Sequence, residues 1–472
     1  MKTIWKKYFL PEKADARRWL ELALSLVLPA VILVCRPIGL NLRQSAVVAG
    51  VLLVIIWWSS GIVKKIPASI FLSVTFCLVS GAGLKTIFSF PLSETFPMIA
   101  ITYLFSQGIA NSGLIDKLFQ PLLLRLVRTP CQCLIAIVAM LYLTMYVIPQ
   151  PLARLIIVAA VFYRFLEGTD LPEKTRSVLM YGVFLFSAVV NMSAKDADMI
   201  MNHVAAGFSE TPISNGMWIR AMLPPTLVTC LLVGVLFVAL FRKDLTGLSM
   251  SARPRREEGP FSRQQKAALA VIGGTVALWM TGSIHGINST LITVAATGIL
   301  FGIRILHKED WKAVDVTTLI FLTAAFAIGG VMKACGAADI VFGLMRGIFP
   351  AEFSARYLFV MILVSMLLHM ILGSNTTTLS VVVPGMMLLC GQTVDSPVIV
   401  FTAILSVSFH AVLPFHSVSM MVGASNGYFP SGYVTRMGLP TTILVYLAAA
   451  GVFLPYWKWI GLIWGAGLGF AA

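Results

Sequence analysis

Apolar runs of roughly 17 to 22 residues recur along the 472-residue chain, and each is long enough to cross about 30 Å of hydrocarbon as an α-helix. The composition agrees with this pattern, because 58% of the residues are apolar, 12% are charged and the mean hydropathy is +0.89. These values differ strongly from those of a soluble globular chain. The sequence therefore predicts an all-α polytopic membrane protein.

The apolar runs differ in whether they are interrupted. Two long stretches have a polar or proline-rich break near the middle and are predicted to be re-entrant hairpins, which enter and leave the membrane on one side: 131–165 and 355–390. Two others are predicted to be broken helices: 178–204 and 398–424. Uninterrupted helices are expected near 19–36, 43–60, 66–83, 96–111, 219–241, 268–285, 288–305, 316–334 and 437–456. Without the hairpins, about 11 crossings result.

Basic residues support this topology. Most of the 35 lysines and arginines fall in segments that the predicted topology places in the cytoplasm, as expected for a cytoplasmic (inner) membrane protein with its N-terminus inside. The net charge of +15 is then a topology signal, and nucleic-acid binding is not needed to explain it. The basic N-terminus precedes an apolar run without a cleavage site, so we expect a retained first helix.

The two halves of the sequence resemble each other. WIRAMLPPT, which begins at Trp218, aligns with VTRMGLPTT, which begins at Val434, and NSGLID at Asn111 corresponds to ACGAAD at Ala334. An odd number of crossings between the halves predicts inverted-topology repeats, the architecture of many secondary transporters. The predicted organisation is an N-terminal segment with the first helix (1–40), a first repeat (41–241), a basic linker (242–266), a second repeat (267–456) and a tail (457–472).

The second hairpin carries the sequence GSNTTT, with Ser374, Asn375, Thr376 and Thr377 in the middle of an apolar stretch. Unpaired polar groups in hydrocarbon cost several kcal/mol. A hairpin tip also frees backbone groups, so this motif is predicted to bind an ion or a carboxylate, although polar glue between helices is the alternative.

At these residues the chain resembles the divalent anion/sodium symporter family, which carries dicarboxylates, citrate and sulfate. The resemblance implies that Ser374, Asn375 and Thr376 contact sodium and the substrate carboxylate. It also implies that the second broken helix, with Pro414 and His416, completes the site. For His416, packing is an open alternative to substrate contact or proton transfer. A homodimer in the lipid membrane is a further implication of the family.

The first hairpin departs from the family motif. Gln150, Pro151 and Leu152 stand where a second Ser-Asn-Thr is expected, and Arg154 follows. Pro151 lacks a backbone donor and Leu152 lacks a hydroxyl. Two roles are open for Arg154, a counter-charge for an anionic substrate or a side chain that snorkels to the cytoplasmic interface.

The first broken helix contains three charged residues, Lys195, Asp196 and Asp198, in a segment predicted to lie in the membrane. Such residues are functional by default. Three interpretations are open. Lys195 replaces a sodium ion as a fixed positive charge, an aspartate carries a coupling proton, or the three residues neutralise one another as structural ion pairs.

The predicted function is secondary active transport of a small anion, a di- or tricarboxylate or similar, by alternating access with sodium coupling. The alternative is a proton-coupled or exchange-type transporter in which Lys195 replaces a sodium site. No Walker A, HExxH or GxSxG pattern is present, and the seven scattered cysteines do not suggest a metal site, so neither an enzyme nor a cofactor other than sodium is expected.

Overall fold

The computed structural model describes residues 16–60, 62–248, 250, 260–338, 340, 346–350, 353–372, 375–390, 393–412 and 416–463. The described chain is built from α-helices with short 3₁₀ and π-helical segments. It divides into two compact units, and each unit combines segments from both halves of the sequence.

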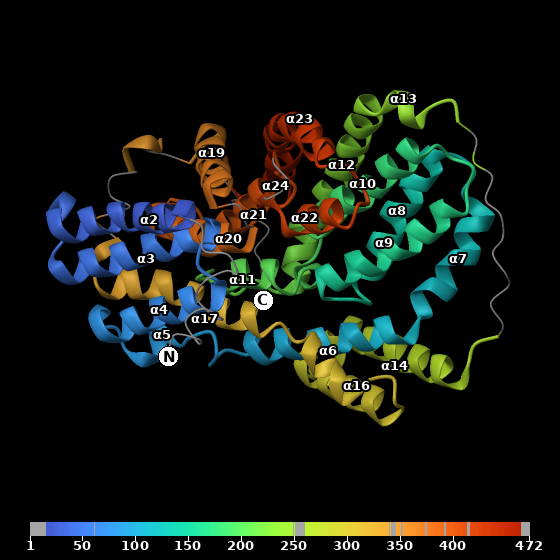
Figure 1. The fold of residues 1–472 in the computed structure, drawn as a ribbon, viewed down its shortest axis with the longest axis horizontal. Helices are drawn as coiled ribbons and strands as arrows, with labels where there is room; N and C mark the ends of the chain where they lie inside the picture. Colours follow the sequence, from blue (N-terminus) through green and yellow to red (C-terminus); the bar gives the residue numbers. More distant parts are fainter. Residues whose placement is uncertain are drawn as a thin grey trace. The chain divides into compact units, whose positions relative to one another are not determined.

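The first unit contains the described parts of Met1–Phe96, Val204–Pro212 and Asp315–Ala403. Its helices are α2 (Ala16–Cys35), α3 (Leu42–Ser60), α4 (Lys65–Thr75), α5 (Leu84–Ile87), α17 (Val316–Ala334), α19 (Ala355–Leu372) and α20 (Asn375–Cys390). Within it α17 packs against α4, α5 and α20, and α19 packs against α20. Figure 1 shows α2 and α3 side by side, in agreement with their contact.

The second unit contains the described parts of Pro97–His203, Ile213–Val314 and Ile404–Ala472. Its helices are α7 (Leu114–Leu126), α8 (Pro130–Met145), α9 (Pro151–Glu167), α10 (Glu173–Val190), α12 (Asn215–Leu240), α13 (Arg242–Leu245), α14 (Arg263–Met280), α15 (Gly282–His285), α16 (Ser289–Gly302), α22 (Val418–Ser425), α23 (Gly432–Ala448) and α24 (Leu454–Trp459). Helices α6 (Thr95–Ser112), α11 (Met201–Gly207) and α21 (Ser396–Val407) have residues in both units.

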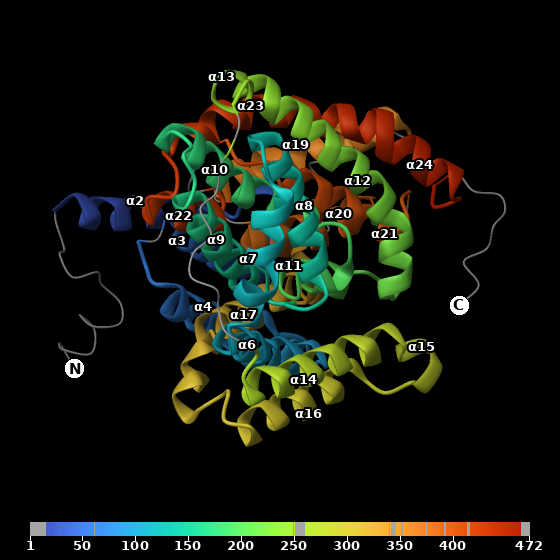
Figure 2. The same cartoon turned by 90° about the vertical axis from the view of Figure 1, so that its right-hand side faces the viewer.

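Helix α10 lies at the centre of the second unit and packs against α8, α9, α12 and α22. Nearly every residue from Val178 to Val190 is buried, because this helix is apolar on all sides. Figure 1 shows α8 and α9 beside it, and Figure 2 shows α14 and α16 packed together in the same unit. Both helices of the first hairpin, α8 and α9, therefore pack against α10.

The interrupted stretches in the sequence are interrupted in the structure. The first predicted hairpin forms α8 and α9 with a break at 146–150, and the second forms α19 and α20. The predicted broken helices correspond to α10 with α11 and to α21 with α22. Helix α7 was not predicted, because its polar face with Lys117 and Arg125 resembles a cytoplasmic loop.

Several helices are suited to cross a membrane. Three of those described are long and apolar enough on their own, Asn215–Leu240, Lys308–Ala334 and Gly432–Trp459, and the bent pair Thr95–Ser112 with Lys117–Leu126 adds a fourth if it is one span. Other apolar helices, such as Pro130–Met145, are shorter. The number of about 11 crossings stays a prediction.

Two glycines end helices at positions that the sequence comparison aligned. Gly113 follows α6 with φ +64°, and Gly336 follows α17 with φ +72°. Glycine adopts this left-handed conformation without a steric penalty, which explains why NSGLID and ACGAAD share it although four of their six residues differ.

Candidate functional site

The tip of the first hairpin is closed by its own residues. Helix α9 begins at Pro151, and the side chain of Gln150 accepts a hydrogen bond from the backbone N–H of Ala153. Pro151 has no N–H, so this cap takes one of the few donors that a helix N-terminus offers to an anion. The backbone N–H of Met199, in the first break, reaches back to the carbonyl of Pro149 at 3.5 Å.

Arg154 lies one turn into α9 and its side chain is completely buried. Its Nη1 donates to the carbonyl oxygens of Ile148 at 2.9 Å and Met145 at 3.3 Å. Its Nη2 donates to Asn191 Oδ1 at 2.5 Å and to the carbonyl of Ala197 at 2.6 Å. One guanidinium thus joins the hairpin tip to the broken helix.

The break at 191–200 exposes backbone carbonyls that side chains then satisfy. Asn202 Nδ2 donates to the carbonyls of Asn191 at 2.7 Å and Ala194 at 2.9 Å. The indole N–H of Trp218 donates to the carbonyl of Met192 at 2.9 Å. Buried backbone groups that leave a helix need such partners, and the polar residues around this break supply them.

Each charged residue of the break has its own partner. The carboxylate of Asp198 accepts from the backbone N–H groups of Ile200 and Met201 and is buried. Asp196 Oδ1 lies 2.9 Å from Nε2 of His203. Lys195 is half-buried and its Nζ donates to the carbonyl of Ile213 at 2.8 Å.

Two of the expected arrangements differ from this geometry. Lys195 and the two aspartates do not form ion pairs with one another, because each binds a different group. Arg154 does not snorkel, because its guanidinium is enclosed by oxygens of the hairpin and the break. The other role open for Arg154, direct pairing with a substrate, stays a prediction, because both Nη atoms already donate but Nε has no hydrogen-bond partner in the described chain.

Three partners in this cluster were not among the predicted site residues: Asn191, Asn202 and His203. His203 follows Asp196 by seven residues, which is two helical turns, so the spacing alone could have predicted the pair. Because the helix is broken between the two residues, a helical spacing rule does not apply there directly. Asn202 is completely buried, and its Oδ1 has no hydrogen-bond partner among the described residues.

The second hairpin, in the first unit, keeps its polar residues at the start of α20. Asn375 and Thr376 are half-buried and Thr377 is completely buried. The hydroxyl of Thr377 has no hydrogen-bond partner within the described chain. Ser374 of the predicted motif lies outside the described residues.

The second break separates α21 from α22. His410 and His416, on either side of it, are each 1% exposed. Pro414, also predicted to belong to the site, lies outside the described residues. At this break α23 approaches the backbone closely, since a Cβ on Gly438 would lie 2.5 Å from the Cα of Val412 and 2.6 Å from the carbonyl oxygen of Ala411.

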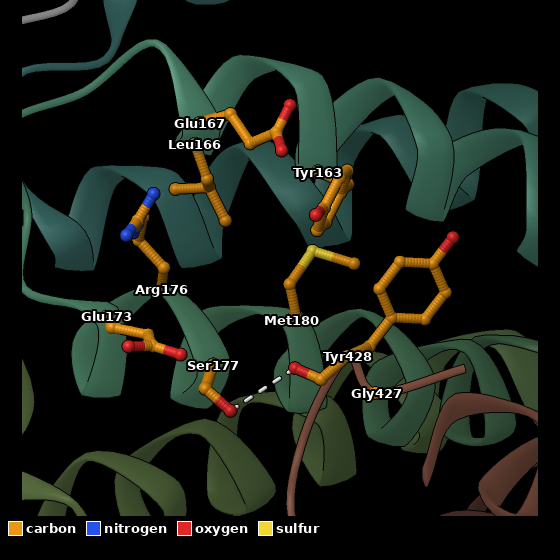
Figure 3. Close-up of a pocket in the computed structure, with 9 residues that line it drawn as sticks. All are labelled: Tyr163, Leu166, Glu167, Glu173, Arg176, Ser177, Met180, Gly427 and Tyr428. Carbon is orange, nitrogen blue, oxygen red and sulfur yellow. Dashed lines mark hydrogen bonds between the residues drawn. The ribbon is translucent and has the colours of Figure 1, made fainter. Parts of the chain in front are cut away.

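A separate cavity of about 290 Å³ opens between α9, α10 and the turn after α22 (Figure 3). Arg176, Glu167 and Glu173 line it, and the Ser177 hydroxyl donates to the carbonyl of Tyr428 at 3.2 Å. None of the predicted site residues lines this cavity. Its two carboxylates make it a poor site for an anion.

Apolar helices with charged and amide side chains gathered at a hairpin tip and a helix break are typical of multi-pass membrane transporters. A family model described as "Sodium:sulfate symporter transmembrane region" matches residues 16–463. The chain belongs to this family. The expected resemblance to divalent anion/sodium symporters is therefore confirmed.

One relative is a protein from Cupriavidus necator described as "Membrane protein". It is 22% identical over 387 residues, which cover 78% of this chain and 75% of the relative. That description names no substrate, so the substrate has to be argued from the site.

Proposed function

We propose that this protein is a secondary active transporter that moves a small di- or tricarboxylate, or a similar anion, across the cytoplasmic membrane by alternating access. Family membership supports an anion as substrate and a cation as coupling ion. The inverted repeats, the N-terminus inside and a homodimer belong to the same proposal. The aligned left-handed glycines Gly113 and Gly336 support the repeats.

The observation that carries the proposal is the half-buried ammonium of Lys195 inside a helix break. Lys195 makes one hydrogen bond within the described structure, to the carbonyl of Ile213. An ammonium has three donors, so two are left for a carboxylate or sulfate oxygen. A charged side chain within a membrane-spanning segment is costly unless it binds a ligand or faces a water-filled cavity.

Sodium coupling is assigned to the second hairpin, with Ser374, Asn375 and Thr376 as the proposed sodium ligands. The buried hydroxyl of Thr377, which lacks a described partner, supports an exchangeable ligand in this region. Hydroxyl, amide and carbonyl oxygens are the ligands that hard cations prefer. Pro414 and His416 in the second break complete the proposed substrate site.

The alternative, proton coupling or exchange, has one specific observation in its favour. Asp196 and His203 form a close pair in the first break, and His203 is nearly buried while the side chain of Asp196 is 36% exposed. A histidine beside a partly exposed carboxylate is the kind of pair that proton-coupled transporters use. Uptake driven by a proton gradient would favour this alternative over sodium coupling.

The test is uptake of labelled dicarboxylates, citrate and sulfate into proteoliposomes, with and without an inward sodium gradient. We expect sodium-stimulated uptake of at least one anion, and loss of that uptake in Lys195→Ala. Normal transport by Lys195→Ala would contradict the role of Lys195. Absence of uptake for every anion would contradict the substrate class, and hydrolysis of a substrate by the purified protein would indicate an enzyme.

A further inference from the structure

The guanidinium of Arg154 is held by oxygen atoms from two segments. Met145 and Ile148 contribute carbonyls from the end of α8 and the hairpin tip, and Asn191 and Ala197 contribute an amide and a carbonyl oxygen from the break. All four donor–acceptor distances lie between 2.5 and 3.3 Å. We call these four oxygens the oxygen cage.

Every oxygen of the cage is uncharged. Asp198 acts on Arg154 electrostatically, but no carboxylate forms a direct ion pair with it in the described structure. Arginine side chains that serve as structural ion pairs usually meet carboxylates, often in a bidentate manner. Carbonyl and amide oxygens around a buried positive charge are instead the environment in which membrane transporters and channels hold alkali cations.

We propose that the Arg154 guanidinium is a tethered cation, which fills an oxygen cage between the first hairpin and the first break in place of an exchangeable alkali ion. The contacts of Arg154 do not depend on the proposed function, and only their consequence for transport rests on it. The cation position between the first hairpin and the first break would then always be occupied by Arg154. Only the second hairpin would take up and release sodium.

The surroundings of the cage agree with a permanent occupant. Gln150 caps the hairpin tip and Pro151 offers no donor there. The other carbonyls of the break at Asn191, Met192 and Ala194 are already bound by Asn202 and Trp218. The described contacts thus leave the four cage oxygens to Arg154 alone.

This arrangement separates the roles of two cations. Arg154 is completely buried and both of its Nη atoms donate to the cage. Lys195 is half-buried and makes one described hydrogen bond. The replacement for sodium is therefore assigned to Arg154, and Lys195 is left to face the anion.

The test removes the tether and supplies free cations. We would measure the thermal unfolding of purified Arg154→Ala in choline, sodium and low guanidinium concentrations, beside the unaltered protein. The variant is expected to lose several degrees of Tm in choline and to recover at least half of the loss with guanidinium or sodium. The control is Arg164→Ala, which removes an exposed arginine from the same helix and is expected to show no such recovery.

A recovery no larger than the ion effect on the unaltered protein would overturn the proposal. If Arg154→Ala does not fold, Arg154→Lys provides the second measurement, because an ammonium in the cage keeps the charge with fewer donors. It is expected to fold with an intermediate Tm that sodium does not change, and a sodium response in this variant would also overturn the proposal. The readout needs no substrate, so failure of the uptake panel and failure of the tethered cation are distinguishable.

Discussion

The two hairpins and the breaks that follow them are built from the same kind of elements but satisfy their polar groups differently. In the first, Arg154, Gln150 and Asn202 bind the freed backbone groups from within the chain. In the second, the hydroxyl of Thr377 has no partner in the described chain. We infer from this difference that the backbone around the first break is held by side chains of the chain itself, whereas the second hairpin binds the exchangeable ligand.

The breaks also differ in how the neighbouring helix holds them. Helix α12 holds the first break through the Trp218 indole, which donates to the carbonyl of Met192. Helix α23 holds the second break by close contact, because Gly438 lets the backbone of Ala411 and Val412 approach. A hydrogen bond holds the first break against its neighbouring helix. At the second break, the lack of a side chain on Gly438 allows the neighbouring helix to pack closely.

The largest loss of stability is expected at this second contact. In Gly438→Ala the new methyl group meets backbone atoms of Val412 and Ala411, which cannot rotate away. The free energy of unfolding should fall by about 1–3 kcal/mol, measured in detergent by chemical unfolding. Gly432→Ala is the matched control on the same helix, since no described atom lies within 4 Å of its Cβ, and an equal loss in both variants would contradict the close contact.

Lys195→Ala should separate transport from stability. The variant loses a charge-assisted hydrogen bond to the anion, which is worth about 1.5–3 kcal/mol, so the uptake rate at low substrate should fall at least about tenfold. Unfolding should change little, because Lys195 makes one described hydrogen bond. Lys333→Ala removes an exposed lysine as a control, and equal uptake by both variants would refute a substrate contact.

Thr377→Val tests whether the second hairpin binds the exchangeable sodium ion. Valine keeps the branched shape and removes a buried hydroxyl that has no described partner, so the free energy of unfolding should stay within about 0.5 kcal/mol of the original. The sodium concentration for half-maximal uptake should rise several-fold. A loss of stability with unchanged sodium dependence would show that the hydroxyl is structural.

The smallest effect on sodium-driven uptake is expected for the pair of Asp196 and His203. A double-mutant cycle with Asp196→Asn and His203→Gln should give a coupling energy of about 0.2–1 kcal/mol, because the side chain of Asp196 is 36% exposed and water screens the pair. Sodium-driven uptake should survive in both variants. If either variant loses uptake that a proton gradient drives in the original protein, the alternative coupling mechanism is favoured.

The sequence predicted the helices better than the site. Apolar runs and their interruptions are local signals, so the expected hairpin at 131–165 corresponds to α8 and α9. The cage around Arg154 depends on partners 37 and 43 residues away, Asn191 and Ala197, whose proximity follows from the packing of α9 against α10. No spacing rule links an arginine to carbonyls at such distances, and neither role expected for Arg154 anticipated it.

The most direct measurement is the dependence of the initial uptake rate on sodium concentration for a transported anion in proteoliposomes. A Hill coefficient of about one is expected, because a cation exchanges at the second hairpin while Arg154 permanently occupies the first. A coefficient of about two or more would show that further sodium ions bind cooperatively, and would contradict a transporter with one fixed and one exchangeable half.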